Sequence, residues 1–296
     1  MALDAQAALI DRLNLEELDQ DLYRGYNEPN RTGRIFGGQV AAQSLMAAGR
    51  TVDGLLAHSL HGYFLRAGDP DIPVIYTVDR IRDGRSFVTR RVVATQRGKA
   101  IFNMACSFHK PEEGLAHQIK MPDAPDPESI PTWAERIGPL WEKTPEKIRK
   151  IWRPGARPID MREVNVPVYL GGEATGGENL IWLKTPGPVP DDPFLHQCIL
   201  AYATDFSLID TMLRQHKERG PWGSLMTASL DHAIWFHAPL RIDDWLLYYQ
   251  DSPVTGGARG YARGSIYTRE GVLVASAAQE GLMRPVTPTK AEDRSI

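Results

Sequence analysis

Asp205 is the residue whose type and position most directly suggest chemistry in this chain. It lies within LAYATDFSLIDTML, residues 200–213, where apolar residues recur at helical spacing on both sides of the acid. An unpaired carboxylate is costly to remove from water, so such an acid lies at a helix end, is paired, or is retained for catalysis. The segment by itself leaves these three alternatives open.

The histidines show no spacing that would predict a metal site. The eight are His58, His61, His109, His117, His196, His216, His232 and His237. His58 and His61 lie in an extended run where a separation of three residues puts them on opposite faces, and His232 and His237 diverge in the same way. We therefore expect no bound metal.

Motifs of several common enzyme classes are absent. There is no G-x-S-x-G nucleophile elbow, and no Walker loop or G-x-G-x-x-G follows an extended run. The glycine-rich GGEATGGEN, residues 171–179, is not followed by a helical pattern that could hold a phosphate, so a loop is the better interpretation.

The composition and the chain ends predict the partners and the location. A net charge of -3 over 296 residues predicts no binding to nucleic acid and leaves small acidic molecules open. Cys106 and Cys198 lie in apolar segments without metal-ligand spacing, which predicts free thiols in a reducing compartment. We see no signal peptide, lipid anchor, peroxisomal signal or run of about 20 apolar residues, and expect a cytoplasmic protein without membrane insertion.

The first part of the chain predicts one helix followed by antiparallel strands. The helical pattern covers residues 36–52 and follows a short extended run, LYRGYN. Alternating β-branched and aromatic residues predict three further extended runs, at 58–68, 73–98 and 100–110. Asp83-Gly84 and Arg97-Gly98 are typical hairpin turns between these strands.

The same order of elements returns after a connector. Residues 111–157 are rich in Pro and acids and predict one short helix at 133–151. Two acids and a proline begin 191–216, where the apolar pattern predicts a single long helix, preceded and followed by extended runs. We therefore predict two units, 1–110 and 158–296, joined by the connector.

A shift of 172 positions indicates that the two units are duplicates. It superposes eight identical pairs without a gap: Phe64 and Phe236, Asp71 and Asp243, Tyr76 and Tyr248, Asp79 and Asp251, Gly84 and Gly256, Arg91 and Arg263, Arg97 and Arg269, and Ala105 and Ala277. Composition alone would give roughly three such matches. The repeat predicts an α+β unit made twice, in which one long helix lies on an antiparallel sheet.

Four segments together carry a resemblance to a known family. They are RIFGGQVAAQSLMAA, HSLHGYFLRAGDPDIPVIYTVDRIRDGRSFVTRRVVATQRGKAIFNMACSF, SLDHAIWFHAPLRIDDWLLYYQDSP and GVLVASAAQEGLMRP. They resemble acyl-CoA thioesterase II, the TesB-type family, which implies a tandem (double) hotdog fold of two antiparallel sheets, each wrapped around a long central helix. The resemblance also implies hydrolysis of medium- to long-chain fatty acyl-CoA, no cofactor, and a homo-oligomer, either a dimer or a tetramer.

The resemblance implies three catalytic residues. They are Asp205 in YATDF, Ser229 in TASLDH, where many relatives carry Thr, and Gln279 in ASAAQEG. Thioester hydrolysis needs a water near the carbonyl carbon, a carboxylate that takes its proton, and donors for the oxyanion. Hydroxyl and amide groups can orient that water, because each both donates and accepts hydrogen bonds.

The predicted site also needs donors for the oxyanion and cations for the CoA phosphates. Backbone N–H groups at a helix start can stabilise an oxyanion, and Gly37 and Gly38 are the candidates. The shift of 172 places Ser107 where a second Gln279 would stand, so we expect one active site per chain. Cations that could bind the CoA phosphates, none preferred, are Arg82, Arg85, Arg90, Arg91, Lys147, Arg149 and Lys150.

Two other functions stay open. A hydratase or dehydratase acting on an enoyl or hydroxyacyl thioester would need a His and a carboxylate in one pocket, and Asp231-His232 is an adjacent pair whose members face opposite ways on a strand. A non-catalytic acyl-CoA sensor would use the same pocket without hydrolysis. Within the hydrolase interpretation, direct attack by water is favoured over a covalent acyl-aspartyl intermediate.

Overall fold

A large antiparallel sheet and a few helices make up the fold. The computed structural model describes residues 2–28, 33–143, 146, 149, 157–167, 172, 176–216 and 225–286. The helices are α1 (Ala2–Leu13), α2 (Gly37–Gly49), α3 (Trp133–Ile137), α5 (Pro193–Thr204) and α6 (Leu208–Leu213), with 3-10 turns η1 (Pro127–Ser129) and η2 (Gly138–Lys143). No helix within the described ranges is long and apolar enough to cross a membrane.

The strands form one continuous sheet. They are β1 (Glu16–Asp19), β2 (Leu22–Gly25), β3 (Leu56–Phe64), β4 (Val74–Asp83), β5 (Phe87–Gln96), β6 (Lys99–His109), β7 (Asp160–Glu163), β8 (Glu178–Lys184), β9 (Leu225–Ser229), β10 (Asp231–Phe236), β11 (Leu246–Gly256), β12 (Arg259–Thr268) and β13 (Leu273–Pro285).

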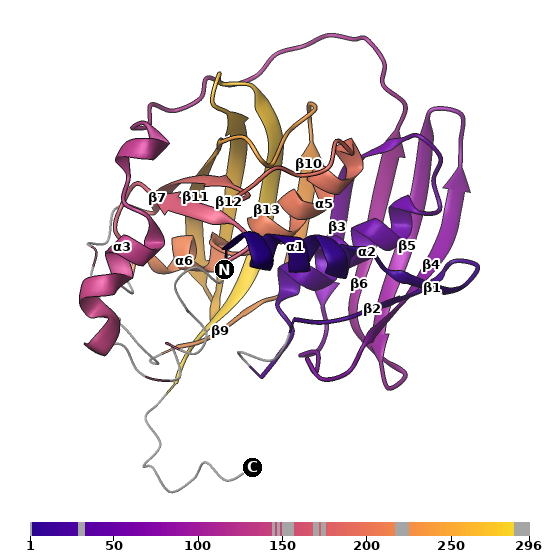
Figure 1. Cartoon of the computed structure of the whole chain (residues 1–296), viewed down its shortest axis with the longest axis horizontal. Helices are drawn as coiled ribbons and strands as arrows, with labels where there is room; N and C mark the ends of the chain where they lie inside the picture. The colour runs from indigo at the N-terminus through magenta and orange to yellow at the C-terminus, as the bar shows by residue number, and fades with distance from the viewer. Residues whose placement is uncertain are drawn as a thin grey trace, which may run out of the picture.

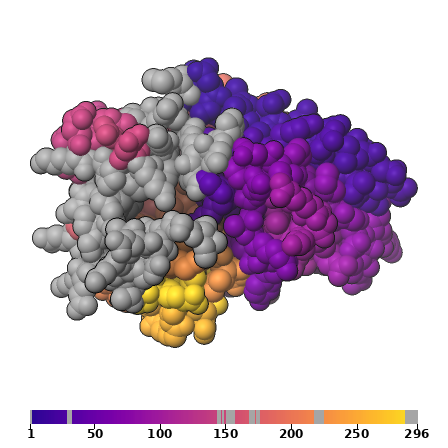
Figure 2. Space-filling model, turned by 90° about the horizontal axis from the view of Figure 1, so that it is seen from below, coloured from indigo at the N-terminus to yellow at the C-terminus, as the bar shows by residue number. Residues whose placement is uncertain are grey.

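The two halves of the sheet have the same strand order. Outward from the centre, the first half runs β3-β6-β5-β4-β2-β1 and the second runs β10-β13-β12-β11-β8-β7, while β9 lies off this path and pairs with β13. β3 and β10 pair antiparallel at the centre, with Ala233 opposite His61, so an approximate two-fold axis relates the halves there. In Figure 2 the first half lies to one side of the molecule and the yellow and orange second half to the other.

The duplication predicted from the sequence is confirmed by the strands and their contacts. β5 and β12 begin and end at positions that differ by 172. Arg91 Nε donates to Asp79 Oδ2 at 2.8 Å on the outer face of the first half, and Arg263 Nε donates to Asp251 Oδ1 at 2.9 Å in the second. The same ion pair therefore joins equivalent neighbouring strands in both units.

Helices α2 and α5 lie side by side against the sheet (Figure 1). They run in opposite directions, so that the start of each lies beside the end of the other. Small residues allow this close contact: a Cβ added to Gly38 would lie 2.5 Å from the Tyr202 carbonyl oxygen, and one added to Gly49 would lie 2.1 Å from the Phe194 ring. Most residues of both helices are buried in the core between the sheet and each other.

The single long helix predicted over 191–216 is wrong. The chain forms α5 and α6, which are separated at residues 205–207. Both helices bury apolar side chains, so the hydrophobic period continues across the break and gives no sign of it. Thr, Asp and Ser are weak helix formers, and Gln250 Nε2 on β11 donates to Ser207 Oγ at 2.6 Å. This contact holds the break from a strand distant in sequence.

The connector is largely irregular and packs along the second half. Trp182 Nε1 donates to Pro125 O at 2.9 Å, and Trp245 Nε1 donates to Glu128 Oε1 at 2.9 Å. Within the helix predicted at 133–151, α3 and η2 extend to Lys143, and most of the rest lies outside the described residues.

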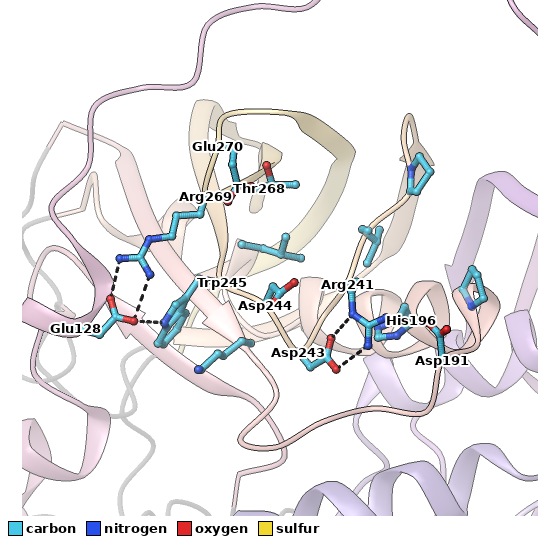
Figure 3. A pocket seen from close by; sticks show the side chains of 15 residues that line it. Glu128, Asp191, His196, Arg241, Asp243, Asp244, Trp245, Thr268, Arg269 and Glu270 are labelled. Atoms are coloured by element: carbon cyan, nitrogen blue, oxygen red, sulfur yellow. Dashed lines mark hydrogen bonds and ion pairs between the residues drawn. The ribbon is translucent and has the colours of Figure 1, made fainter.

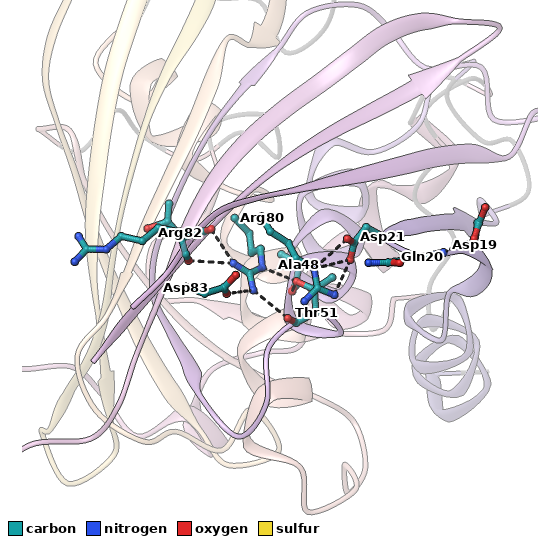
Figure 4. A network of polar contacts seen from close by, with 10 residues as sticks. Asp19, Gln20, Asp21, Ala48, Thr51, Arg80, Arg82 and Asp83 are labelled. Carbon is teal, nitrogen blue, oxygen red and sulfur yellow. Dashed lines mark hydrogen bonds and ion pairs between the residues drawn. The ribbon is translucent and has the colours of Figure 1, made fainter. Parts of the chain in front are cut away.

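Polar contacts join the C-terminal end of α2 to the neighbouring strands, and Thr51, Arg82 and Asp83 of this network are labelled in Figure 4. Arg90 on β5 is 1% exposed. Its Nε donates to Thr51 Oγ1 at 2.7 Å, its Nη2 donates to Thr51 O at 3.1 Å, and its Nη1 donates to Arg82 O at 3.1 Å. A cation is favourable at this end because the last carbonyl groups of a helix carry partial negative charge.

Replacing Arg90 by Met should lower the free energy of unfolding by about 2–4 kcal/mol, because buried oxygens of Thr51 and Arg82 lose their donor. Arg91→Met is the matched control on the same strand. Its side chain is 59% exposed, and an exposed ion pair contributes less than about 1 kcal/mol. Denaturant unfolding of both variants measures the difference, and equal losses would contradict this role for Arg90.

Candidate active site

Asp205 ends α5 beside the start of α2. It is the C-cap of α5 and is only 7% exposed. Of the alternatives that its sequence position left open, the structure shows two together: the acid lies at a helix end, and it is hydrogen-bonded. The third alternative, catalysis, depends on what surrounds the carboxylate.

The N-terminus of α2 interacts with this carboxylate. Phe36 precedes α2 without a side-chain cap, and the first turn contains no acid. Asp205, at the end of α5, takes the role of the missing capping acid of α2, because the Gly38 backbone N–H donates to its carboxylate. Gly37 leaves the necessary room: a Cβ there would lie 2.8 Å from Asp205 Oδ2. The partial positive charge of a helix N-terminus favours the ionised acid.

Ser229 and Gln279 reach Asp205 from two paired strands, β9 and β13. Ser229 Oγ donates to Asp205 Oδ1 at 3.2 Å, and Gln279 Nε2 donates to Ser229 Oγ at 2.8 Å. Gln279 is 1% exposed and lies on the inward face of β13, as the strand alternation predicts. The structure therefore brings all three predicted residues into one hydrogen-bonded chain.

His232 and Thr204 extend this chain and were missed from the sequence. His232 Nδ1 lies 2.6 Å from Gln279 Oε1, and His232 Nε2 lies 2.9 Å from Thr204 Oγ1. Both side chains are fully buried. A signal was present, because His232 alternates in β10 with the apolar residues Ile234 and Phe236 and so shares their inward face.

Burial governs the protonation of the site. Burial raises the pKa of Asp205 to about 7, against hydrogen bonds from Ser229, the Gly38 N–H and Gln279, which lower it. Burial also lowers the pKa of His232 to about 4. Near neutral pH the carboxylate can therefore exchange a proton, while the imidazole stays neutral.

Asp231, the other half of the adjacent pair considered for a hydratase, does not join this chain. Its Oδ1 accepts from the Glu280 backbone N–H at 2.6 Å. His232 instead has both ring nitrogens against Gln279 and Thr204. The carboxylate and the imidazole of the site are thus separated by an amide and a hydroxyl.

The opposite end of the helix pair lacks this chain of polar groups. There, the Gln197 side chain accepts from Ala57 N at 3.1 Å and donates to Ala57 O at 2.8 Å. The Phe194 ring lies directly against Gly49. By the shift of 172, Leu60 stands in place of His232 and Ser107 in place of Gln279.

A cavity of about 640 Å³ also lies toward that opposite end (Figure 3). Pro193 and His196 at the start of α5 line it, together with the loop before β11 and the turn between β12 and β13. The 12 residues of α5, or about 18 Å, separate this end of the helix from Asp205. Arg241 in its wall is already paired with Asp191 and Asp243.

The predicted cations for the CoA phosphates are partly excluded. Arg90 is buried, and its donor groups are engaged by Thr51 after α2 and by Arg82, Asp83 and Thr89 on the strands. Lys147 and Lys150 lie outside the described residues. Arg34 acts on the Asp205 carboxylate by charge and donates to Thr227 O, so it lies on the site side of the molecule. The described residues contain no group of three or more side chains that could ligate a metal.

Two family descriptions match the chain. "Acyl-CoA thioesterase N-terminal domain" matches residues 27–109, and "Acyl-CoA thioesterase" matches residues 152–282. Each match contains one of the two central helices with the strands that follow it.

Known proteins are similar over almost the whole chain. Mouse "Acyl-coenzyme A thioesterase 8" is 41% identical, with 92% of this chain and 87% of that protein covered. The crystal structure of acyl-CoA thioesterase II TesB2 from Mycobacterium marinum is 41% identical with a TM-score of 0.77, covering 96% of this chain and 99% of that one.

The fold is shared more widely. An Alicyclobacillus acidocaldarius protein of unknown function with a hotdog fold superposes with a TM-score of 0.74 at 18% identity, covering 95% of this chain and 99% of that one. The double hotdog fold and the TesB-type resemblance are confirmed. The chain belongs to the acyl-CoA thioesterase II family.

Proposed function

We propose that this chain hydrolyses fatty acyl-CoA to free fatty acid and CoA, with Asp205 as general base. The observation that carries the proposal is the buried chain of Asp205, Ser229 and Gln279, in which a carboxylate with a pKa of about 7 accepts from a hydroxyl that in turn accepts from an amide. Family membership supplies the thioester substrate class.

The reaction is proposed to begin with a water bound between Asp205, Ser229 and Gln279. The water oxygen attacks the thioester carbonyl carbon while Asp205 takes its proton, and a tetrahedral oxyanion forms. Collapse of this intermediate breaks the C–S bond. Asp205 returns the proton to the departing thiolate, which leaves the acid, CoA thiol and an ionised Asp205. A pKa near neutrality suits a group that must first accept and then donate a proton.

Gly37 and Gly38 are proposed to form the oxyanion site at the N-terminus of α2. The position is supported by their contact with Asp205 and by the partial positive charge of a helix start. The Gly38 N–H already donates to Asp205, so Gly37 has the freer backbone donor of the two for this role. A co-crystal structure with a thioether analogue in which the carbonyl oxygen points away from Gly37 N would contradict it.

Direct attack by water is favoured over a covalent intermediate on Asp205. Ser229, the Gly38 N–H and Gln279 all hydrogen-bond to this carboxylate. These contacts hold it as a base and hinder the approach of its oxygens to a carbonyl carbon. A burst of one thiol per chain in the first turnover would instead indicate an acyl-enzyme.

Chain length, assembly and location are further proposals. We propose a preference for medium to long acyl chains, to be measured by thiol release from acyl-CoA of four to eighteen carbons. We propose a homo-oligomer, supported by the exposed edge strand β1, which sedimentation would test. Two free buried cysteines support a cytoplasmic location, which cell fractionation would test.

We propose that the chain is divided into the units 1–110 and 158–296, joined by the connector. Limited proteolysis would test these units.

Asp205→Asn should lower kcat by about a hundredfold to ten-thousandfold, and Ser229→Ala and Gln279→Ala by about tenfold to a thousandfold. Asp192→Asn is the matched control, because it makes the same change at the other end of α5, where Asn also serves as an N-cap. Thiol release with palmitoyl-CoA measures all four. Undiminished release by Asp205→Asn would refute the general base, and wild-type binding without release would indicate a sensor.

The pH dependence should follow the ionisation of Asp205. Because the base must be ionised, kcat/KM should rise with pH through about 7 and level off above it. His232 does not titrate in this range, since burial holds its pKa at about 4. A profile that is flat between pH 5 and pH 9 would mean that Asp205 is not the titrating base.

One acyl-CoA should bind per chain at the catalytic end of the helix pair. At the other end, Gln197 bonds to the backbone of Ala57 and Phe194 packs on Gly49, and the described residues there form no chain of carboxylate, hydroxyl and amide like that of Asp205, Ser229 and Gln279. Calorimetric titration with a non-hydrolysable acyl-CoA thioether gives the stoichiometry. Two equivalent sites per chain would refute this prediction.

A further inference from the structure

Thr204 and His232 form a buried pair beside the three residues of the proposed mechanism. Thr204 Oγ1 lies 2.9 Å from His232 Nε2, and the other ring nitrogen lies 2.6 Å from Gln279 Oε1. We infer that Thr204 and His232 are positioning residues that determine which way the Gln279 side-chain amide points. The inference rests on the proposed function, in which Gln279 donates to Ser229.

The direction of each hydrogen bond follows from the carboxylate. An ionised Asp205 can only accept, so Ser229 gives it its one hydroxyl proton. Ser229 Oγ then accepts from Gln279 Nε2, which leaves Gln279 Oε1 as an acceptor facing His232 Nδ1. His232 must therefore carry its proton on Nδ1, and its Nε2 must accept from the Thr204 hydroxyl.

The other histidine tautomer would turn the amide around. With the proton on Nε2, the Nδ1 of His232 would become an acceptor opposite the amide oxygen of Gln279. Rotating the amide by half a turn relieves that contact, but it places the amide oxygen against Ser229. Ser229 would then lose its donor, and two acceptors, Asp205 and Gln279, would compete for one hydroxyl proton.

The Thr204 hydroxyl decides between these arrangements. It can donate to His232 Nε2 or to Ala201 O, which lies 3.1 Å away in the preceding turn. Donation to Nε2 stabilises the tautomer that keeps Gln279 Nε2 on Ser229. Because Thr204 precedes Asp205, the hydrogen bonds form a ring that begins and ends at the C-terminus of α5. A single helix end thus positions both the base and the amide.

Removal of the Thr204 hydroxyl tests the inference. Thr204→Val should lower kcat by about tenfold to a hundredfold with little change in KM, because a misdirected group near the reacting atoms costs rate without removing a substrate contact. Thr204→Ser restores the hydroxyl and should keep most of the kcat. Ser44→Ala is the matched control: it removes a buried hydroxyl from α2, and that hydroxyl has no hydrogen-bond partner among the described residues.

The pH profile separates positioning from a general loss of packing. Gln279 and Ser229 lower the pKa of Asp205 by hydrogen bonding, so Thr204→Val should move the acid limb of kcat/KM to higher pH, and Ser44→Ala should not. Arg34, from the segment before α2, also acts on Asp205 by charge and is unchanged in both variants. Tyr248 on β11, whose pKa is raised by burial and then by the charge of Asp205, is unchanged as well. Wild-type kcat with an unshifted limb in Thr204→Val would overturn the inference.

A measurement on the unmodified protein makes the test independent of variant folding. The ¹⁵N chemical shifts of a neutral imidazole show which nitrogen carries the proton, and we expect Nδ1–H for His232. A wild-type spectrum with the proton on Nε2 would overturn the inference even if Thr204→Val does not fold. Failure of the proposed function is distinct: it would show as undiminished thiol release by Asp205→Asn.

Discussion

The burial of one carboxylate between the ends of two antiparallel helices is the constraint on which the site depends. At the end of α5, Asp205 faces the partial negative charge of its own helix, while the start of α2 supplies N–H groups that favour its ionised form. Burial raises the pKa of Asp205 to about 7 against these N–H groups and the Ser229 hydroxyl. The opposing effects leave a carboxylate that can gain and lose a proton near neutral pH.

This constraint explains why both units are needed for one site. The second unit contributes Asp205, Ser229 and Gln279, and the first contributes the glycine pair at the start of α2, whose missing side chains let the carboxylate approach. The sheet is nearly symmetric, yet at the other end of the helix pair the Phe194 ring packs on Gly49 and Gln197 bonds to backbone. The repeat supplies the scaffold twice, and among the described residues the chain of carboxylate, hydroxyl and amide forms at one end of the helix pair.

Local patterns in the sequence determined the elements and the repeat. Alternation placed the strands, and the Arg97-Gly98 turn has positive φ at both residues, 48° and 71°, as a two-residue hairpin requires. Asp192 and Pro193 begin α5 as the capping pattern predicts. The repeat at 172 positions and the family motifs then gave the double unit and the residues Asp205, Ser229 and Gln279.

Contacts between distant segments decided the rest. The break after Thr204 depends on Gln250 from β11, and the inclusion of His232 depends on Gln279 and Thr204, which lie 47 and 28 residues away. Periodicity in the sequence indicates which side of a helix or strand is apolar. It does not indicate which buried polar atoms form hydrogen bonds with one another. The sequence by itself therefore determined the scaffold and the identity of three polar residues. Only the tertiary structure decided their hydrogen-bond order, because hydrogen bonds depend on distances that only packing sets.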